Sequence, residues 1–163
     1  MNLGRFLDEE RVDLQLDALI PDDETPDGSP AAVAHEALVR HMASLLVTSD
    51  EVVNATKLEN DLVLRERREA TLLGQGVAMP HVRTLQARKL VIAVGVSHAG
   101  LAIAGTPDDE LIRLVISFVG PSYDDKVYLL AYRRLGEKLQ EDWWVQMVLE
   151  AEEPGEIVRA LAM

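Results

Sequence analysis

One histidine of this chain, together with the residues around it, is best suited to covalent chemistry. Pro80 directly precedes His81, and a proline fixes one backbone angle and removes a donor beside the imidazole. A neutral imidazole, whose ordinary pKa is about 6.5, is a competent nucleophile at neutral pH. Arg65 lies upstream near an expected helix end, and its planar guanidinium matches phosphate oxygens. The pair suits phosphoryl transfer, although a histidine after a proline is more often structural.

Two glycines precede this histidine in the stretch ATLLGQGVAMPH. Gly74 and Gly76 allow a close approach of the backbone and could leave amide groups free to meet an anion. The chain has no cysteine, which excludes a disulfide, a thiolate nucleophile and a thiolate metal site. No convincing cluster of metal ligands is present in the sequence, so we expect neither a metal nor another cofactor.

The other three histidines are expected to be structural. His35 and His41 are six residues apart in a predicted helix, which places them on different faces, so they do not form the i,i+4 pair of a helical metal site. His98 lies in a turn of small residues after a predicted strand. None of the three has a neighbour that indicates chemistry.

Strands and helices are expected to alternate along the chain. Residues 11–16 alternate between apolar and polar, which predicts a half-buried strand. The β-branched runs at 90–96 and 111–119 predict strands that are covered on both faces. Residues 70–81 are expected to be extended or turning because they contain glycine and proline. Helices are predicted over residues 29–47, 48–65, 124–140, 141–151 and 154–161.

This alternation predicts one α/β domain over residues 1–163. We expect a mixed, mostly buried β-sheet with helices on both sides. An exposed acidic loop is predicted at residues 21–28, where two prolines and a glycine accompany four acidic side chains.

The charge of the chain limits its partners. The formal net charge is −12, from 28 acidic and 16 basic side chains. Such a polyanion is repelled by phosphate backbones, so nucleic acid is not an expected partner. No apolar run approaches the ~20 residues that span a bilayer, and the start of the chain lacks the features of a secretory signal. We therefore expect a cytoplasmic protein without membrane insertion.

The segment RERREATLLGQGVAMPH resembles the signature of the fructose/mannitol-type enzyme IIA family of the bacterial phosphotransferase system, which includes nitrogen-regulatory members. That signature is approximately R-E-x(4)-T-x-x-G-x-G-x-A-x-P-H. The matching positions are Arg65, Glu66, Thr71, Gly74, Gly76, Ala78, Pro80 and His81. The later segments VIAVGVSHAGLAIAG, LIRLVISFVGP and LLAYRRLGEKLQEDWW also resemble members of this family.

The resemblance implies a phosphocarrier. His81 would accept a phosphoryl group from an HPr-type phosphocarrier protein, and Arg65 would stabilise that group. The onward partner would be a IIB component or a regulatory target protein. A nitrogen-regulatory IIA protein is our leading hypothesis. The alternatives are a IIA component that feeds a sugar transporter and a binding module that kept the fold but lost the relay.

The sequence departs from the family at one position of the expected site. Many members carry a second histidine at the start of the helix after the last long strand, whereas the window DDKVYLLAY contains none. Lys126 aligns with that position. A lysine can neutralise phosphate as a point charge but cannot accept a hydrogen bond or share a proton as an imidazole does.

Overall fold

A mixed six-stranded sheet forms the centre of the computed structural model, which describes residues 1–19, 30–106 and 110–163. The strand order is β1-β5-β6-β3-β2, and β4 also pairs with β6. Strand β5 runs antiparallel to β6, while β3 and β4 run parallel to β6. The strands are β1 (Val12–Asp13), β2 (Leu72–Gly74), β3 (Val77–Ala78), β4 (His81–Thr84), β5 (Val91–Leu101) and β6 (Ile112–Pro121).

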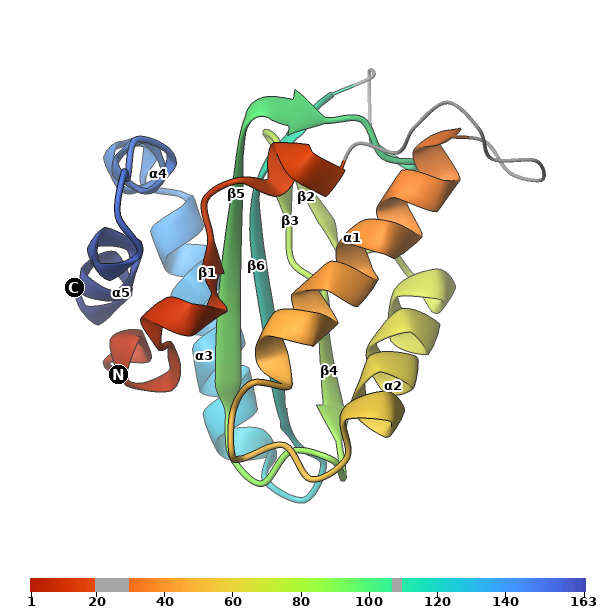
Figure 1. Cartoon of the computed structure of the whole chain (residues 1–163). Coiled ribbons are helices and arrows are strands. Elements are labelled where there is room, and N and C mark those ends of the chain that lie inside the picture. The colour runs from red at the N-terminus through yellow and green to blue at the C-terminus, as the bar shows by residue number, and fades with distance from the viewer. Residues whose placement is uncertain (20–29, 107–109) are drawn as a thin grey trace.

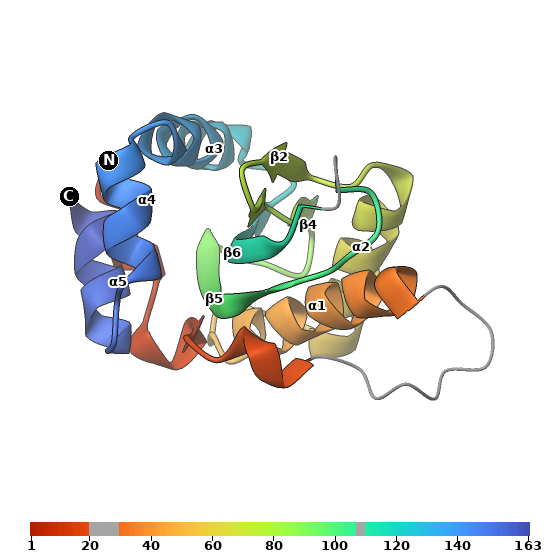
Figure 2. The same cartoon turned by 90° about the horizontal axis from the view of Figure 1, so that it is seen from above.

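Helices cover both faces of this sheet. Figure 1 shows α1 and α2 on one side, and Figure 2 shows α3 on the other, with α4 and α5 beside it. This arrangement confirms the predicted α/β class. The helices are α1 (Pro30–Leu46), α2 (Ala55–Arg68), α3 (Asp125–Leu139), α4 (Asp142–Leu149) and α5 (Pro154–Ala162), with short 3₁₀ helices η1 (Leu3–Phe6), η2 (Glu9–Arg11) and η3 (Leu16–Leu19).

The sheet separates two apolar cores, because successive side chains of a strand point to opposite faces. In β5, Ile92 and Val94 lie in the core beneath α3, α4 and α5. Val91 and Ala93 lie in the core beneath α1 and α2. The near-continuous apolar run of this strand is therefore buried on both faces, as the sequence predicted.

The predicted strand at residues 11–16 is much shorter in the structure. Only Val12 and Asp13 pair with β5, and η3 begins at Leu16. The Asp13 carboxylate accepts a hydrogen bond from the Gln15 backbone at 2.8 Å, a local turn that competes with strand pairing. Leu16 then packs closely against Gly95, where an added Cβ would lie only 2.6 Å from the leucine side chain.

The second helix begins later than predicted. Thr48 does not start a helix, because its hydroxyl donates to the Leu45 carbonyl at the end of α1, at 2.7 Å. Asn54 is the N-cap of α2, and its side chain accepts from the Lys57 backbone at 3.0 Å.

Strand β5 extends to Leu101, past its predicted end at residue 96.

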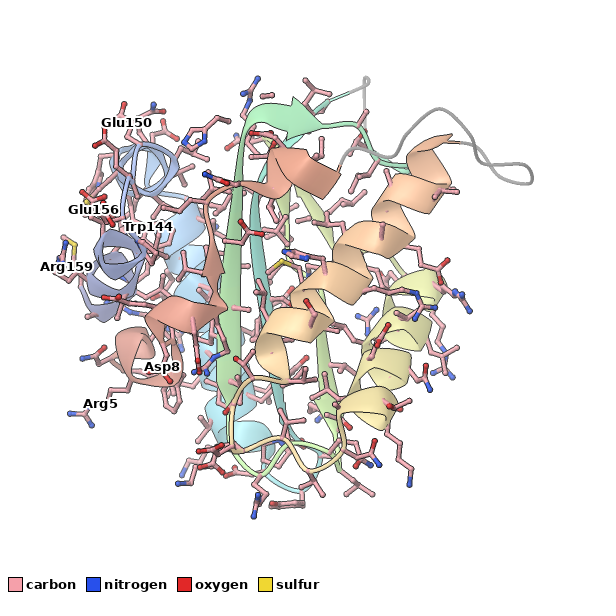
Figure 3. The ribbon with its side chains drawn as sticks, viewed as in Figure 1. Arg5, Asp8, Trp144, Glu150, Glu156 and Arg159 are labelled. Carbon is pink, nitrogen blue, oxygen red and sulfur yellow. The ribbon has the colours of Figure 1, made fainter. Side chains whose placement is uncertain are left out.

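The C-terminal helices pack on each other beside α3. Trp144 lies between α4 and α5 in Figure 3, and its indole nitrogen donates to the Ala160 carbonyl at 3.0 Å. Glu156 forms a capping box with Glu153 at the start of α5. The helices α4 and α5 share an apolar core with α3, to which α3 contributes Ala131 and Leu135.

The described residues contain no helix that is both long enough and apolar enough to cross a bilayer. The acidic loop that was predicted at residues 21–28 lies outside the described residues, as does the helix start predicted at Ser29.

Candidate functional site

The first residue of β4 is His81, and its backbone is fixed by the neighbouring strand. His81 lies opposite Phe118 in the parallel pairing of β4 with β6. The carbonyl of Pro80 accepts two hydrogen bonds from β6, one from the Phe118 backbone at 3.2 Å and one from the Ser117 hydroxyl at 2.7 Å. Both lone pairs of that oxygen are used, so the backbone before His81 is held firmly.

The hydrogen bonding of His81 determines which ring nitrogen is available for chemistry. Nδ1 lies 2.6 Å from the carbonyl oxygen of Met79. A carbonyl oxygen only accepts, so Nδ1 must carry the hydrogen. In the neutral ring Nε2 then has an unshared electron pair, and it has no hydrogen-bond partner among the described residues. His81 therefore presents Nε2 as a nucleophile.

Aromatic rings hold the imidazole in place. The Phe118 ring stacks on it, with ring centroids 4.9 Å apart and an angle of 13° between the planes. Two tyrosines of α3 also contact it, Tyr132 at 5.3 Å and Tyr128 at 6.0 Å between centroids. Only 7% of His81 is exposed. The ring is positioned by packing before any ligand binds.

The surroundings of His81 favour its neutral form. Burial is the largest influence and lowers the pKa of His81, because an imidazolium loses hydration there. The hydrogen bond to Met79 raises this pKa, while the positive charge of Arg65 lowers it again. The net direction is below the ordinary value. His81 is therefore unprotonated at Nε2 at neutral pH.

A pocket of about 440 Å³ opens onto this ring. It is lined by Arg65, His81, Val82, Arg83, Tyr128, Leu129 and Tyr132. Arg65 lies in the last turns of α2, where its guanidinium donates to the Glu69 carbonyl at 2.9 Å. The structure thus brings Arg65 and His81 together, as the sequence predicted. With two arginines on its wall, the pocket is suited to an anion.

Lys126 does not line this pocket. It is exposed in the first turn of α3, whereas the tyrosines that face His81 lie two and six positions further along the helix. Leu129, three positions after Lys126, does line the pocket, so Lys126 lies about one helical turn nearer to the start of α3. The structure therefore does not place Lys126 on the pocket wall, where the alignment led us to expect it.

The two glycines of the signature do not line the pocket either. Both have a positive φ, 81° at Gly74 and 77° at Gly76, and they shape the hairpin between β2 and β3. An added Cβ at Gly76 would lie 2.9 Å from the Leu111 carbonyl oxygen. Gly76 thus allows β3 to lie close to the chain that enters β6, and neither glycine is placed where its amide could meet an anion in this pocket.

A buried carboxylate supports the site from behind. Glu66 is 5% exposed and accepts from the Thr71 backbone at 3.0 Å and from the Thr71 hydroxyl at 2.8 Å. His35 Nε2 lies 3.0 Å from the same carboxylate. Thr71 in turn accepts from the Met79 backbone at 2.8 Å. This chain of contacts connects α1 and α2 with the residue whose carbonyl orients His81.

The pKa of Glu66 reflects these contacts. Burial is the largest single influence and raises it, but hydrogen bonds from His35 and from Thr71 together lower it below the ordinary value. Glu66 is therefore a charged acceptor at neutral pH, although it is buried.

Arg83, Tyr128 and Tyr132 are pocket residues that the sequence analysis missed. Their spacing carried a signal. Arg83 lies two residues after His81 in a strand, which places both on one face. Tyr128 and Tyr132 are four apart in a helix, which also places them on one face.

In the described part of the chain, no group of three His, Asp or Glu side chains could hold a metal ion.

Comparison with solved structures shows the same fold in other proteins. The nitrogen regulatory protein IIA-Ntr from Neisseria meningitidis superposes with a TM-score of 0.76 at 20% identity, over 98% of each chain. The mannitol IIA protein from Escherichia coli gives a TM-score of 0.69 at 19% identity, over 96% of this chain and 99% of that one. A complex of the E. coli mannitol IIA enzyme with phosphorylated mannitol IIB gives 0.68 at 18% identity, over 96% of both chains.

Sequence comparison identifies the family. No curated protein matches this chain. The family model described as "Phosphoenolpyruvate-dependent sugar phosphotransferase system, EIIA 2" matches residues 29–163, which is most of the chain and includes every residue of the pocket. The chain therefore belongs to the EIIA 2 family of the phosphoenolpyruvate-dependent sugar phosphotransferase system.

Proposed function

We propose that this protein is a phosphocarrier that accepts a phosphoryl group on Nε2 of His81. The observation that carries the proposal is the hydrogen bond of Nδ1 to the Met79 carbonyl at 2.6 Å, which leaves the lone pair of Nε2 free in a pocket with Arg65. Burial lowers the pKa of His81, which keeps that lone pair available at neutral pH.

The transfer needs no proton movement at His81. The Nε2 lone pair forms a bond to phosphorus while the bond from phosphorus to the donor atom breaks and its electron pair leaves with the donor. The imidazole becomes cationic, and its Nδ1 hydrogen stays on the ring, directed at the Met79 carbonyl. That hydrogen bond strengthens as the charge develops. In the onward step a nucleophile of the acceptor attacks the phosphorus, the bond from phosphorus to Nε2 breaks, and its electron pair returns to the ring, which becomes neutral again.

The pocket supplies the positive charge that a loose phosphoryl transition state requires. Such a transition state asks for positioning and charge neutralisation rather than for further covalent chemistry. Arg65 is our proposed contact to the phosphoryl oxygens. Arg83 also lines the pocket, but it forms an ion pair with Asp125, so part of its charge is already compensated.

The partners follow from this assignment. We propose an HPr-type phosphocarrier protein as the donor and a cytoplasmic location, where such a relay operates. A nitrogen-regulatory role, in which a target protein responds to the phosphorylation state, remains our proposal for the onward step. The alternative is transfer to a IIB component of a sugar transporter.

The proposal is tested by incubating the protein with enzyme I, an HPr-type carrier and phosphoenolpyruvate, followed by intact-mass analysis. We expect one acid-labile phosphoryl group, and no added mass in His81→Ala. The thermal transition of that variant should stay near that of the native protein. Labelling that persists in His81→Ala would overturn the site. An unlabelled native protein would favour the relay-inactive binding module.

The onward step has its own assay. The labelled protein is mixed with a purified IIB domain of the mannitol or fructose type, and the mass of both proteins is followed. Retention of the phosphoryl group supports a regulatory role, whereas its rapid loss to the IIB domain supports sugar transport.

A further inference from the structure

A buried phenol in the wall of the pocket has no partner inside the protein. Tyr128 is 8% exposed, and its hydroxyl makes no hydrogen bond within the described residues. Its oxygen is not among the fully buried polar atoms that lack a partner, so it keeps contact with solvent. The solvent it can meet is in the pocket that Tyr128 lines together with His81.

We propose that the Tyr128 hydroxyl donates a hydrogen bond to the phosphoryl group at His81 Nε2. This inference rests on the proposed phosphoryl transfer and assigns it one further catalytic residue. The phenol keeps its proton throughout and only donates, so no additional bond is made or broken.

The neighbours of Tyr128 fix its position. Its ring packs 5.2 Å from the Phe118 ring and 6.0 Å from the His81 ring, between centroids. The guanidinium of Arg83 lies over its face, 5.7 Å from the centroid. A ring held on several sides loses little freedom when its hydroxyl meets a ligand, which favours a hydrogen bond to a transient group.

The charge state of the phenol suits a donor. Burial raises the pKa of Tyr128 to about 12, although Arg65 and Arg83 both act against this rise. The phenol therefore carries its hydrogen across the physiological pH range. Because both arginines influence this hydroxyl electrostatically, an anion that they attract would also lie within its surroundings.

Tyr123 provides a control outside the pocket. It precedes α3, it is 70% exposed, and it is not one of the residues that line the pocket. A hydroxyl on an exposed side chain exchanges hydrogen bonds with water at little net gain, so its removal should change the transfer little.

The experiment compares Tyr128→Phe, Tyr123→Phe and the native chain with two phosphoryl donors. One donor is the relay of enzyme I and HPr-type carrier, and the other is potassium phosphoramidate, a small donor that needs no docking. Labelling of His81 is followed by intact mass at timed quenches. We expect Tyr128→Phe to be about ten- to a hundredfold slower with both donors, since a hydrogen bond to a charged group is lost. Tyr123→Phe should stay within about twofold of the native rate.

Each outcome separates this inference from the proposed function. If phosphoramidate labels Tyr128→Phe and the native chain at equal rates, the inference is overturned. This holds even if the relay labels Tyr128→Phe more slowly, because the slower rate would then come from weaker docking of the HPr-type carrier. A native protein that phosphoramidate labels in a Tyr128-dependent way, but that the relay does not label, would overturn only the proposed function. A native protein that neither donor labels would overturn both. The Nδ1–H signal of His81 in NMR spectra should persist in Tyr128→Phe, which excludes a displaced ring as the cause of a slower rate.

Discussion

The α1 side of the sheet and the β4 side place histidines in opposite surroundings. On the α1 side, His35 lies 3.0 Å from the Glu66 carboxylate and His41 lies 2.7 Å from the Asp13 carboxylate. On the β4 side, His81 meets a neutral carbonyl and the positive charge of Arg65. The hydrogen-bonded ring nitrogen is Nε2 in His35 and His41, whereas in His81 it is Nδ1, so Nε2 is the nitrogen left without a partner among the described residues.

The hydrogen-bond partners distinguish these histidines more clearly than their exposure does. His81 is 7% exposed, and the side chain of His35 is only 15% exposed, so burial alone would rank them together. The two carboxylate-bound histidines tie elements together: α1 to α2 through Glu66, and α1 to β1 through Asp13. Among the histidines of the described residues, only His81 is packed between aromatic rings in a pocket that it shares with Arg65.

The largest effect is expected from removing the carboxylate on the α1 side. Glu66→Ala leaves His35 and the two Thr71 donors without their acceptor in a buried site, which should cost about 3–5 kcal/mol of unfolding free energy. Asp13→Ala is the matched variant, since its pair with His41 is half-buried, and it should cost at most about 1 kcal/mol. Urea denaturation measures both values. Equal losses of unfolding free energy in the two variants would show that burial does not distinguish the Glu66–His35 pair from the Asp13–His41 pair.

A second prediction concerns the positive charge on the β4 side. Arg65→Lys keeps the charge but loses the planar fork that matches phosphate oxygens. One lost charge-assisted contact is worth roughly 1.5–3 kcal/mol, which is about ten- to a hundredfold in rate. The loss of rate is measured by timed phosphorylation of His81 in the relay. Arg67→Lys is the control, because Arg67 lies outside the pocket. Native rates in Arg65→Lys would place Arg65 away from the phosphoryl group.

A third prediction uses pH. Burial, with Arg65, lowers the pKa of His81, so its folded form takes up a proton at lower pH than the unfolded chain does. The stability that depends on neutral His81 is therefore present above about pH 6.5 and is lost as the pH falls below it. NMR titration of His81 should give a midpoint below about 6.5, and phosphoramidate labelling should decline with the same midpoint. A midpoint at or above the ordinary value would contradict the assigned environment.

The smallest effect is expected at Lys126. Lys126→His and Lys126→Glu should both be labelled within about twofold of the native rate by phosphoramidate, because the side chain is exposed and lies outside the pocket. A marked loss of labelling rate in Lys126→Glu would instead support the position beside His81 that the sequence alignment predicted for this lysine.

The sequence predicted the fold class and two residues of the pocket because their signals were local. Continuous apolar runs predicted β5 and β6, and the spacing from Arg65 to His81 matched a family signature. The start of α2 was misplaced because the Thr48 hydroxyl bonds backward to α1, a choice that its sequence neighbours do not specify. Tyr128 was missed because its role depends on how α3 is rotated against β6, and that rotation is set by packing.

The two hydrogen bonds at the Pro80 carbonyl have a consequence for how a partner could recognise the modified protein. They fix the backbone at His81 to β6, so a group added to the imidazole has little room to move the chain. A phosphoryl group adds nearly two negative charges near neutral pH. The two forms of the protein would then present one shape with two electrostatic potentials. A partner that distinguishes them would have to respond to the field around the pocket.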